Sequence, residues 1–317
     1  MTGRVLLTGG AGFIGSHVAD GYLEAGYEVT IIDNLSSGRQ ANLPRKAKFV
    51  RGDIGSPEAR KLVASGGFTI LNHHAAQIDV RVSVSDPARD AQINILGLLN
   101  LLEGAREGGV KRVVFASSGG VVYGESDRLP HPEEAPKLPV SGYGCSKLAS
   151  EYYLSTYFQL YGIDAVALRY ANVYGPRQNT EGEAGVVAIF GSRILRGDPL
   201  TIFGDGQQTR DYVFVGDVAR ANVRAATGPL PRRTTIDAAA FNVGTGKETS
   251  VNDLVATMLK ATGKKVPVKH APARAGELQR SAVDPGKIGR EWGWKPEVDL
   301  EQGLRQTYQW ISSQAAA

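Results

Sequence analysis

Two side chains four residues apart, Tyr143 and Lys147, have the types and the spacing for acid–base chemistry. Residues four apart lie on one face of a helix, so the phenol and the ammonium would face the same space. A phenol with an ordinary pKa of about 10 is a poor base at neutral pH. A neighbouring positive charge favours the phenolate, so the pair predicts a proton-transferring site with Tyr143 as the base.

Two hydroxyls, those of Ser117 and Ser118, follow the apolar run from Arg112 to Phe115. Such a run is typical of a buried strand, and parallel α/β sheets bind ligands at the carboxyl ends of their strands. We therefore predict that a serine at this strand end lies beside Tyr143 and Lys147. Ser118 is the predicted catalytic hydroxyl, and Ser117 is the alternative.

Glycines are spaced for phosphate binding between the first predicted strand and the first predicted helix. From Thr8 to Gly15 they satisfy both G-x-G-x-x-G and G-x-x-G-x-x-G. Gly9 allows a backbone with positive φ, Gly12 lets the backbone approach a pyrophosphate, and Gly15 lets the helix pack closely on the strand. Free N–H groups at the helix N-terminus bind phosphate oxygens, so the segment predicts a dinucleotide site.

Asp33 ends the second predicted strand, 18 residues after Gly15. A carboxylate in this position accepts hydrogen bonds from the adenosine ribose diol and repels a 2′-phosphate. The sequence therefore favours NAD over NADP, while Arg39, a few residues further on, keeps NADP open as the alternative.

Further polar segments follow the third and fourth predicted strands. Asp53 and Ile54 are placed to hold the adenine amino group, and the segment from His73 to Gln77 is placed to line the pyrophosphate crevice. We expect no metal at His73 and His74, because no other ligand stands at a suitable spacing.

The elements that must position these residues alternate between short apolar runs and helical patterns, which indicates βαβ units on a parallel sheet. The predicted strands are Arg4–Leu7, Glu28–Ile32, Lys48–Arg51, Phe68–Leu71, Arg112–Phe115 and Ala165–Arg169. The predicted helices are Phe13–Ala25, Glu58–Ala64, Pro87–Glu107, Ser146–Leu160, Val186–Leu195, Asp217–Ala226, Val251–Ala261 and Leu300–Ile311. We predict an α/β fold: a Rossmann-type doubly wound parallel sheet in residues 1–169, and a smaller C-terminal α/β substrate domain in residues 170–317, from which the chain can cross back to the first.

Composition excludes several classes of protein. The 317 residues carry 36 Lys+Arg against 32 Asp+Glu and are 42% hydrophobic, which is typical of a packed globular protein and too balanced for a nucleic-acid binder. The N-terminus lacks signal-peptide architecture and no stretch approaches 18 apolar residues, so we expect a cytoplasmic protein that does not enter the membrane. The single cysteine, Cys145, excludes an intramolecular disulfide and is interpreted as a small packing residue.

Together these motifs resemble the extended short-chain dehydrogenases/reductases, and within them the UDP-glucose (UDP-galactose) 4-epimerases, over essentially the whole chain. The matching segments are Thr8–Ser16, Asp33–Gly38, Ser117–Gly124, Tyr143–Lys147, Arg169–Arg177 and Arg210–Val215. The resemblance implies an NAD-dependent enzyme that inverts C4 of a UDP-hexose through a transient 4-keto sugar.

The resemblance also implies roles for single residues. Ser118 and Tyr143 would bond to the sugar 4-hydroxyl, and Lys147 to the nicotinamide ribose. The implied cofactor-binding residues are Gly9, Gly12, Phe13, Ile14, Gly15, Asp33, Asn34, Ser36, Gly38, Asp53, Ile54, Ala75, Ala76, Gln77, Asn94, Tyr143, Lys147 and Tyr170. The implied substrate-binding residues are Ser118, Tyr143, Asn172, Val187, Thr201, Phe203, Arg210, Arg274, Glu277 and Ser281.

Two other functions and one departure from the family pattern stay open. A nucleotide-sugar 4,6-dehydratase or decarboxylase needs an extra acidic residue beside the catalytic hydroxyl, where this chain has Gly119 and Gly120. A non-catalytic NAD-sensing protein typically lacks part of the triad, which is complete here. The serine segment is one residue longer than the commonest family form, so Ser117 stays the alternative to Ser118.

Substrate breadth and assembly are also implied by the resemblance. Aligned through Arg274 and Glu277, Ser281 matches the position that limits room near the sugar 2-substituent. A small residue there is similar to forms that also accept N-acetylated sugars, so we expect turnover of UDP-galactose and of UDP-N-acetylgalactosamine. The apolar helices Pro87–Glu107 and Ser146–Leu160 resemble the pairs that form a four-helix interface, which predicts a homodimer.

Overall fold

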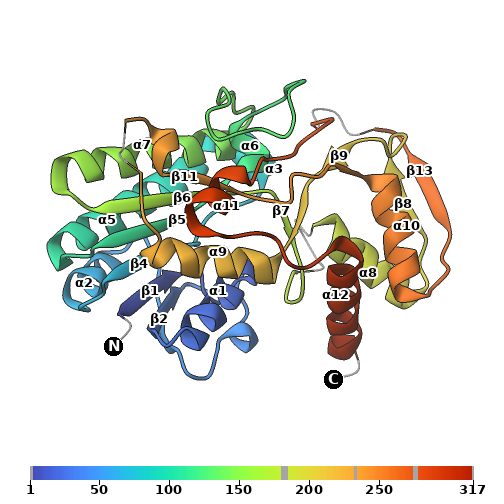
Figure 1. Ribbon diagram of the computed structural model, residues 1–317. Helices are drawn as coiled ribbons and strands as arrows, with labels where there is room; N and C mark the ends of the chain where they lie inside the picture. Colours follow the sequence, from blue (N-terminus) through green and yellow to red (C-terminus); the bar gives the residue numbers. More distant parts are fainter. Residues whose placement is uncertain (1–2, 180–184, 232–233, 274–277, 316–317) are drawn as a thin grey trace.

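The computed structural model describes residues 3–179, 185–231, 234–273 and 278–315 (Figure 1). Its centre is a seven-stranded sheet in which every neighbouring pair is parallel, in the order β11-β6-β5-β4-β1-β2-β3. The strands are β1 (Arg4–Thr8), β2 (Glu28–Asp33), β3 (Lys48–Arg51), β4 (Ile70–His73), β5 (Arg112–Ser118), β6 (Asp164–Tyr170) and β11 (Ala240–Val243). Because the strand order reverses between β1 and β4, a crevice is expected where these two strands end.

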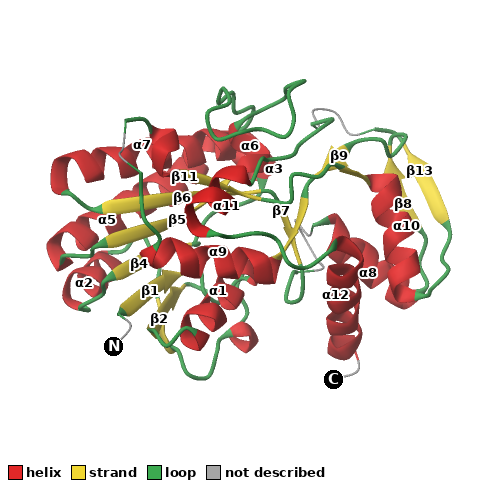
Figure 2. Ribbon diagram, viewed as in Figure 1, coloured by secondary structure: helices red, strands yellow, loops and turns green. Residues whose placement is uncertain are grey.

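Helices cover both faces of the sheet (Figure 2). One face packs against α1 (Phe13–Glu24), α9 (Val215–Thr227) and α11 (Gly286–Trp292). The other packs against α2 (Pro57–Ser65), α5 (Gly97–Gly108) and α7 (Gly142–Tyr161). Successive strand side chains point to opposite faces, so Val5 and Leu7 are buried in the first layer and Leu6 in the second.

A second core lies beyond the carboxyl edge of the sheet, at the right of Figure 1. Apolar side chains such as Phe190, Ile202, Leu254 and Leu304 fill it. Its elements are α8 (Val186–Arg196), β8 (Leu200–Phe203), α10 (Val251–Thr262), β13 (Val268–Ala271) and α12 (Leu300–Ala315). The short pairs β7 (Asn172–Tyr174) with β10 (Tyr212–Phe214), and β9 (Thr209–Arg210) with β12 (Thr249–Ser250), lie between this core and the sheet.

The remaining elements are short. They are the 3-10 turns η1 (Gln40–Asn42) and η3 (Ile236–Ala239), the helices α3 (Val80–Ser85), α4 (Pro87–Ala91) and α6 (Gly119–Val122), and the π turn η2 (Gln92–Leu96). Among the described residues no helix combines the length and the apolar character that crossing a membrane requires.

The predicted fold class and all six predicted strands are confirmed, with local differences. The fourth strand lies two residues later than predicted, so its last residue, His73, pairs with Thr8 and Phe115. The predicted helix Pro87–Glu107 is three pieces, because η2 interrupts it between α4 and α5. The seventh strand, β11, was not among the predicted strands; it pairs with β6, so the chain does cross back to the sheet.

Candidate active site

The glycine turn connects β1 to α1 at the crevice. Gly9 has φ +71°, which favours glycine, and a Cβ there would lie 2.6 Å from the backbone nitrogen of Ala75. A Cβ at Gly15 would collide with the carbonyl of Gly9. Gly12 is the N-cap of α1. The N-cap of α1 therefore carries no side chain and makes no side-chain cap hydrogen bond, which fits a dinucleotide pyrophosphate at this helix N-terminus.

Asp33 lies at the carboxyl end of β2 and is 7% exposed. Its Oδ2 accepts a hydrogen bond from the backbone N–H of Ala11 at 3.0 Å, and its Oδ1 accepts one from Leu35 at 2.8 Å. A carboxylate has room for about four hydrogen bonds, so a ribose diol can still be accommodated. Asp33 thus fixes the glycine turn, and its role toward the ribose stays a prediction.

The neighbouring loop residues form a connected edge. Asn34 Nδ2 donates to Asp53 Oδ2 at 2.9 Å and Asn34 Oδ1 accepts from the Ser36 N–H, while Ile54 is buried beneath. A Cβ at Gly38 would lie 2.8 Å from that of Ala11, so this loop lies close against the glycine turn.

The segment after β4 is held by β1. Thr8 Oγ1 lies 2.7 Å from His73 Nδ1 and accepts from the backbone N–H of Ala75 at 3.1 Å. His74 Nε2 lies 3.1 Å from the Tyr170 hydroxyl. Burial, followed by the charge of Lys147, lowers the pKa of each histidine to about 3, so both are neutral at neutral pH.

The segment then turns past Ala76 to Gln77, which is paired with Asn94. The Gln77 N–H donates to Asn94 Oδ1 and Asn94 Nδ2 donates to the Gln77 carbonyl, each at 2.9 Å. Asn94 is buried and lies in the π turn η2. Single π turns inside helices often occur at functional sites, and this one carries a predicted cofactor residue.

Tyr143 and Lys147 are in the first turns of α7, which is capped by Ser141. Lys147 is 4% exposed, and its Nζ donates to the Ala116 carbonyl on β5 at 2.8 Å. The Nζ lies 5.5 Å from the centre of the Tyr143 ring. The predicted pair is therefore close in space and fixed to the end of β5.

The expected lowering of the Tyr143 pKa requires the Lys147 ammonium together with the positive nicotinamide of NAD, and it stays a prediction. Burial lowers the pKa of Lys147 to about 8, against the opposing charges of Asp90 and Glu151. Burial, and then the Asp90 carboxylate, raises the pKa of Tyr143 above its usual value. The ammonium alone does not lower the phenol pKa here, so a further positive charge is required to favour the phenolate.

Ser117 and Ser118 have different surroundings. Ser117 is buried, and its hydroxyl donates to Glu151 Oε1 on α7 at 2.6 Å. Ser118 Oγ and Asn172 Oδ1 lie 3.8 and 3.9 Å from the position of a Cβ added to Gly120, so they face one space. Because Ser117 is engaged behind the strand, this arrangement supports Ser118 as the catalytic hydroxyl.

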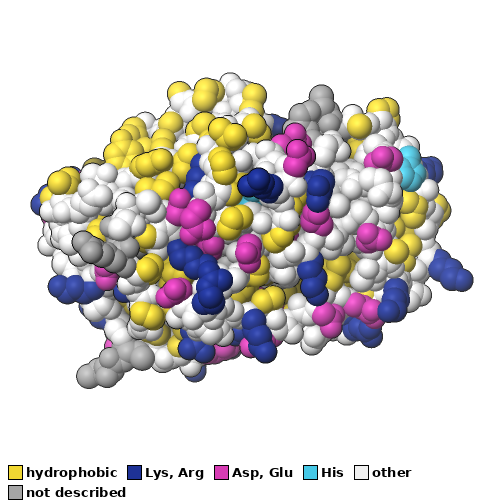
Figure 3. All heavy atoms as spheres, turned by 45° about the horizontal axis from the view of Figure 1, so that its top comes forward, with side chains coloured by type: hydrophobic (Ala, Val, Ile, Leu, Met, Phe, Trp, Pro, Cys, Tyr) yellow, Lys and Arg dark blue, Asp and Glu magenta, His cyan; other side chains and the backbone are white. Residues whose placement is uncertain are grey.

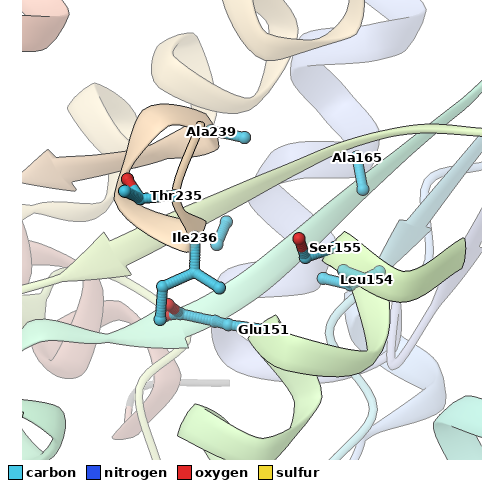
Figure 4. A pocket seen from close by; sticks show the side chains of 8 residues that line it. Glu151, Leu154, Ser155, Ala165, Thr235, Ile236 and Ala239 are labelled. Atoms are coloured by element: carbon cyan, nitrogen blue, oxygen red, sulfur yellow. The ribbon is translucent and has the colours of Figure 1, made fainter. Parts of the chain in front are cut away.

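Behind Ser117 lies a buried ion pair that sequence reasoning missed. Glu151 Oε2 accepts from Arg169 Nη2 at 2.6 Å, and both side chains are 1% exposed or less. Arg169 also donates to Oδ1 of Asp237, a residue of η3, at 2.8 Å. Glu151 lines a space of about 20 Å³ between α7, β6 and η3 (Figure 4), which holds roughly one water and is too small for a sugar.

The predicted substrate residues come from several elements beyond the sheet. Val187 is buried in α8, Thr201 Oγ1 on β8 accepts from Arg193 at 2.9 Å, and Arg210 on β9 donates to the Thr209 carbonyl. Phe203 ends β8, and Ser281 is 7% exposed. Arg274 and Glu277 lie outside the described residues.

The interpretation of Cys145 as a packing residue is wrong, because its side chain is exposed. The buried face of α7 includes Ser146, Lys147 and Ser150, so Cys145 points outward.

Asp90 was not among the predicted site residues; it is 1% exposed and lies next to the predicted site. The sequence contains no indication that Asp90 is buried, because a carboxylate in an amphipathic helix pattern is ordinarily expected on the exposed face. Within the described part of the chain, no group of three potential ligands could hold a metal ion.

A doubly wound parallel sheet with a glycine turn at its switch point, and a tyrosine–lysine pair on one helix whose lysine is buried, define an extended short-chain dehydrogenase/reductase. The chain belongs to the NAD dependent epimerase/dehydratase family, whose model matches residues 5–244.

Similar proteins extend over the whole length. A putative UDP-glucose 4-epimerase of Methanocaldococcus jannaschii is 45% identical over 309 residues, 98% of each chain. The structure of a Thermotoga maritima UDP-glucose 4-epimerase with UDP-glucose has a TM-score of 0.93 and 45% identity, covering 98% of this chain and 99% of that one. That of a Thermus thermophilus UDP-glucose 4-epimerase with NAD has a TM-score of 0.88 and 44% identity, with the same coverage.

Proposed function

We propose that this protein is a UDP-glucose 4-epimerase that uses NAD to interconvert UDP-glucose and UDP-galactose, a step of galactose metabolism. The observation that carries the proposal is the pair formed by Tyr143 and the buried Lys147 at the end of β5. The chain that holds this pair is similar over nearly its whole length, at 44–45% identity, to proteins named UDP-glucose 4-epimerase.

The chain's own residues would bind and orient the reacting groups. Tyr143 would exchange the proton of the sugar 4-hydroxyl, Ser118 would bond to the same hydroxyl, and Lys147 would bond to the nicotinamide ribose. Bound NAD supplies reversible hydride transfer at C4 and a positive charge, which is the charge that the Tyr143 phenol needs to lose its proton.

The two parts of the chain would divide the work. We assign cofactor binding to residues 1–169 and nucleotide-sugar binding to residues 170–317, with α9 and β11 of the second part returning to the sheet. Arg210, Asn172 and the segment that includes Arg274 and Glu277 would hold the uridine diphosphate, since guanidinium groups match phosphate oxygens. Because the diphosphate would be held firmly, the sugar itself would be free to rotate within the site.

The test is incubation of the purified protein with a panel of UDP-sugars and no added NAD, with the products resolved by chromatography. We expect interconversion of UDP-glucose and UDP-galactose. Tyr143→Phe should lower kcat at least about a hundredfold, the low end for general acid–base catalysis, with substrate binding retained. Near wild-type turnover by this variant would remove Tyr143 from the mechanism. A 4-keto-6-deoxy product would instead indicate a dehydratase, and absence of any turnover a sensor.

The surface formed by α7 and η2 supports a homodimer. Large apolar side chains on α7 and η2 are exposed, among them Tyr152 (56%) and Leu96 (49%). Figure 3 shows apolar side chains gathered on the face that α7 occupies at the upper left of Figure 1. Contiguous apolar surface of this kind marks protein–protein interfaces. With one cysteine in 317 residues, we also place the enzyme in the cytoplasm.

A further inference from the structure

The carboxylate of Asp90 joins three elements around the active site. Asp90 lies in α4 and is 1% exposed. Its Oδ1 accepts hydrogen bonds from Gln77 Nε2 and Asn94 Nδ2, both at 3.0 Å. Its Oδ2 accepts one from the hydroxyl of Ser146 on α7 at 2.5 Å. One side chain therefore connects the loop after β4, the π turn η2 and the helix that carries Tyr143.

All three donors to Asp90 are neutral groups, so hydrogen bonding leaves its charge uncompensated. Within the described residues Asp90 forms no ion pair. The residue that follows Ser146 is Lys147, a buried ammonium whose nitrogen donates to a carbonyl rather than to a carboxylate. Burying a charge without a counter-charge costs free energy of folding. The Asp90 carboxylate and the Lys147 ammonium have opposite charges, so each can serve as the counter-charge of the other.

The other groups that face Lys147 do not replace Asp90. On α7 these are the neutral phenol of Tyr143 and Glu151, whose carboxylate is already paired with Arg169. Two neutral imidazoles at the end of β4 also face it: His73 and His74. Of the two carboxylates that raise the pKa of Lys147 against the effect of burial, Asp90 has the larger effect.

We propose that Asp90 is a positioning residue of the active site: it fixes the cofactor-side loop against α7 and is the buried counter-charge that keeps Lys147 protonated. Its part in turnover rests on the proposed function, but the ionisation of Lys147 can be measured independently of turnover.

The variant Asp90→Asn separates charge from shape. The asparagine Oδ1 can still accept from Gln77 and Asn94, and its Nδ2 can donate to the Ser146 hydroxyl, so only the charge is lost. The measurement is the titration of Lys147 in full-length protein, as purified, carrying ¹³Cε-labelled lysine, with the signal identified by its loss in Lys147→Met. We expect the midpoint to fall by about one pH unit in Asp90→Asn, as for a close counter-charge.

Asp217→Asn is the matched control, because Asp217 is a fully buried carboxylate of α9 away from Lys147. It should leave the Lys147 midpoint unchanged. In turnover, Asp90→Asn should move the alkaline limb of the kcat profile to lower pH by the same amount, with KM for UDP-galactose within about threefold.

A folded Asp90→Asn protein with a wild-type Lys147 midpoint would overturn the proposal. If Asp90→Asn does not fold, the wild-type titration decides, because the proposal requires Lys147 to stay protonated at pH 7, and a midpoint below 7 contradicts it. If the wild type turns over no UDP-sugar, the proposed function fails while the titration still tests the counter-charge.

Discussion

Neighbouring residues in this site have different surroundings, as Ser117 and Ser118 show. A strand sends successive side chains to opposite faces, so Ser117 donates to Glu151 behind the sheet, while Ser118 faces the same space as Asn172. The surroundings of Asp90 also depend on the fold, because it is buried by contacts with residues distant in the sequence, such as Ser146.

The two serines can be separated by substitution. Ser118→Ala should lower kcat by about tenfold to a hundredfold, because it removes a hydrogen bond to the reacting hydroxyl. Ser117→Ala should leave kcat within about threefold but lower the free energy of unfolding by about 1–3 kcal/mol, because Glu151 loses a donor in a buried site. Steady-state kinetics and urea unfolding of both variants check this; the reverse pattern would assign the catalytic hydroxyl to Ser117.

The range of sugars that the enzyme accepts is predicted to depend on the volume of the Ser281 side chain. Ser281 is 7% exposed, and in the predicted pocket its small side chain would leave room for an acetamido group. Ser281→Tyr should abolish turnover of UDP-N-acetylgalactosamine and keep UDP-galactose within about tenfold, because a ring fills the space that an N-acetyl group needs. Paired assays with the two sugars test whether the size of residue 281 limits which sugars are accepted. This limit is contradicted by equal loss of both, or by a wild type inactive on the N-acetyl sugar.

At the scale of elements, the glycine turn and the end of β2 form one unit. The Asp33 carboxylate holds the turn through Ala11 and the following loop through Leu35. Elements α7 and β5 form a second unit. Lys147 donates to the carbonyl of Ala116, and Glu151, one helical turn later, accepts from the hydroxyl of Ser117, the next residue of the strand. Helix α7 is thus fixed to the end of β5 at two successive strand residues.

Asp33→Ala should weaken NAD far more than NADP, by at least about tenfold, because the loss includes a charged hydrogen-bond acceptor for the ribose diol and the repulsion of a 2′-phosphate. Cofactor-stripped protein titrated with each dinucleotide gives the two affinities. Asp198→Ala, which alters an exposed carboxylate of the second part, is the control. An unchanged NAD to NADP ratio would restrict Asp33 to supporting the turn.

At the scale of the whole molecule, the apolar surface over α7 and η2 is the feature that a single chain leaves uncovered. Tyr152→Glu and Leu96→Glu each place a charge on this surface, so we expect either to shift the protein from about 68 kDa toward its chain mass of 33.8 kDa. Light scattering at micromolar concentration measures this. Val268→Glu is the control, since Val268 on β13 is 40% exposed but far along the chain from both helices. A wild type of single-chain mass would reject the dimer.

Features that local spacing encodes could be predicted from the sequence alone. Buried strands appear as short apolar runs, the glycine turn as fixed offsets from Gly9 to Gly15, and the Tyr143–Lys147 pair as one helical turn, because each depends on residues close in the chain. This was enough to predict the fold class, six of the seven strands of the sheet and most residues of the candidate site.

Contacts between segments distant in the sequence are visible only in the folded chain. The Asp90–Ser146 bond joins residues 56 apart, the Ser117–Glu151 bond residues 34 apart, and the Arg169–Asp237 pair residues 68 apart. No local periodicity distinguishes a buried carboxylate of this kind from a solvated one, because its burial is set by the strands and helices that meet around it. The same reason explains β11, whose place beside β6 is fixed by the sheet and not by its own four residues.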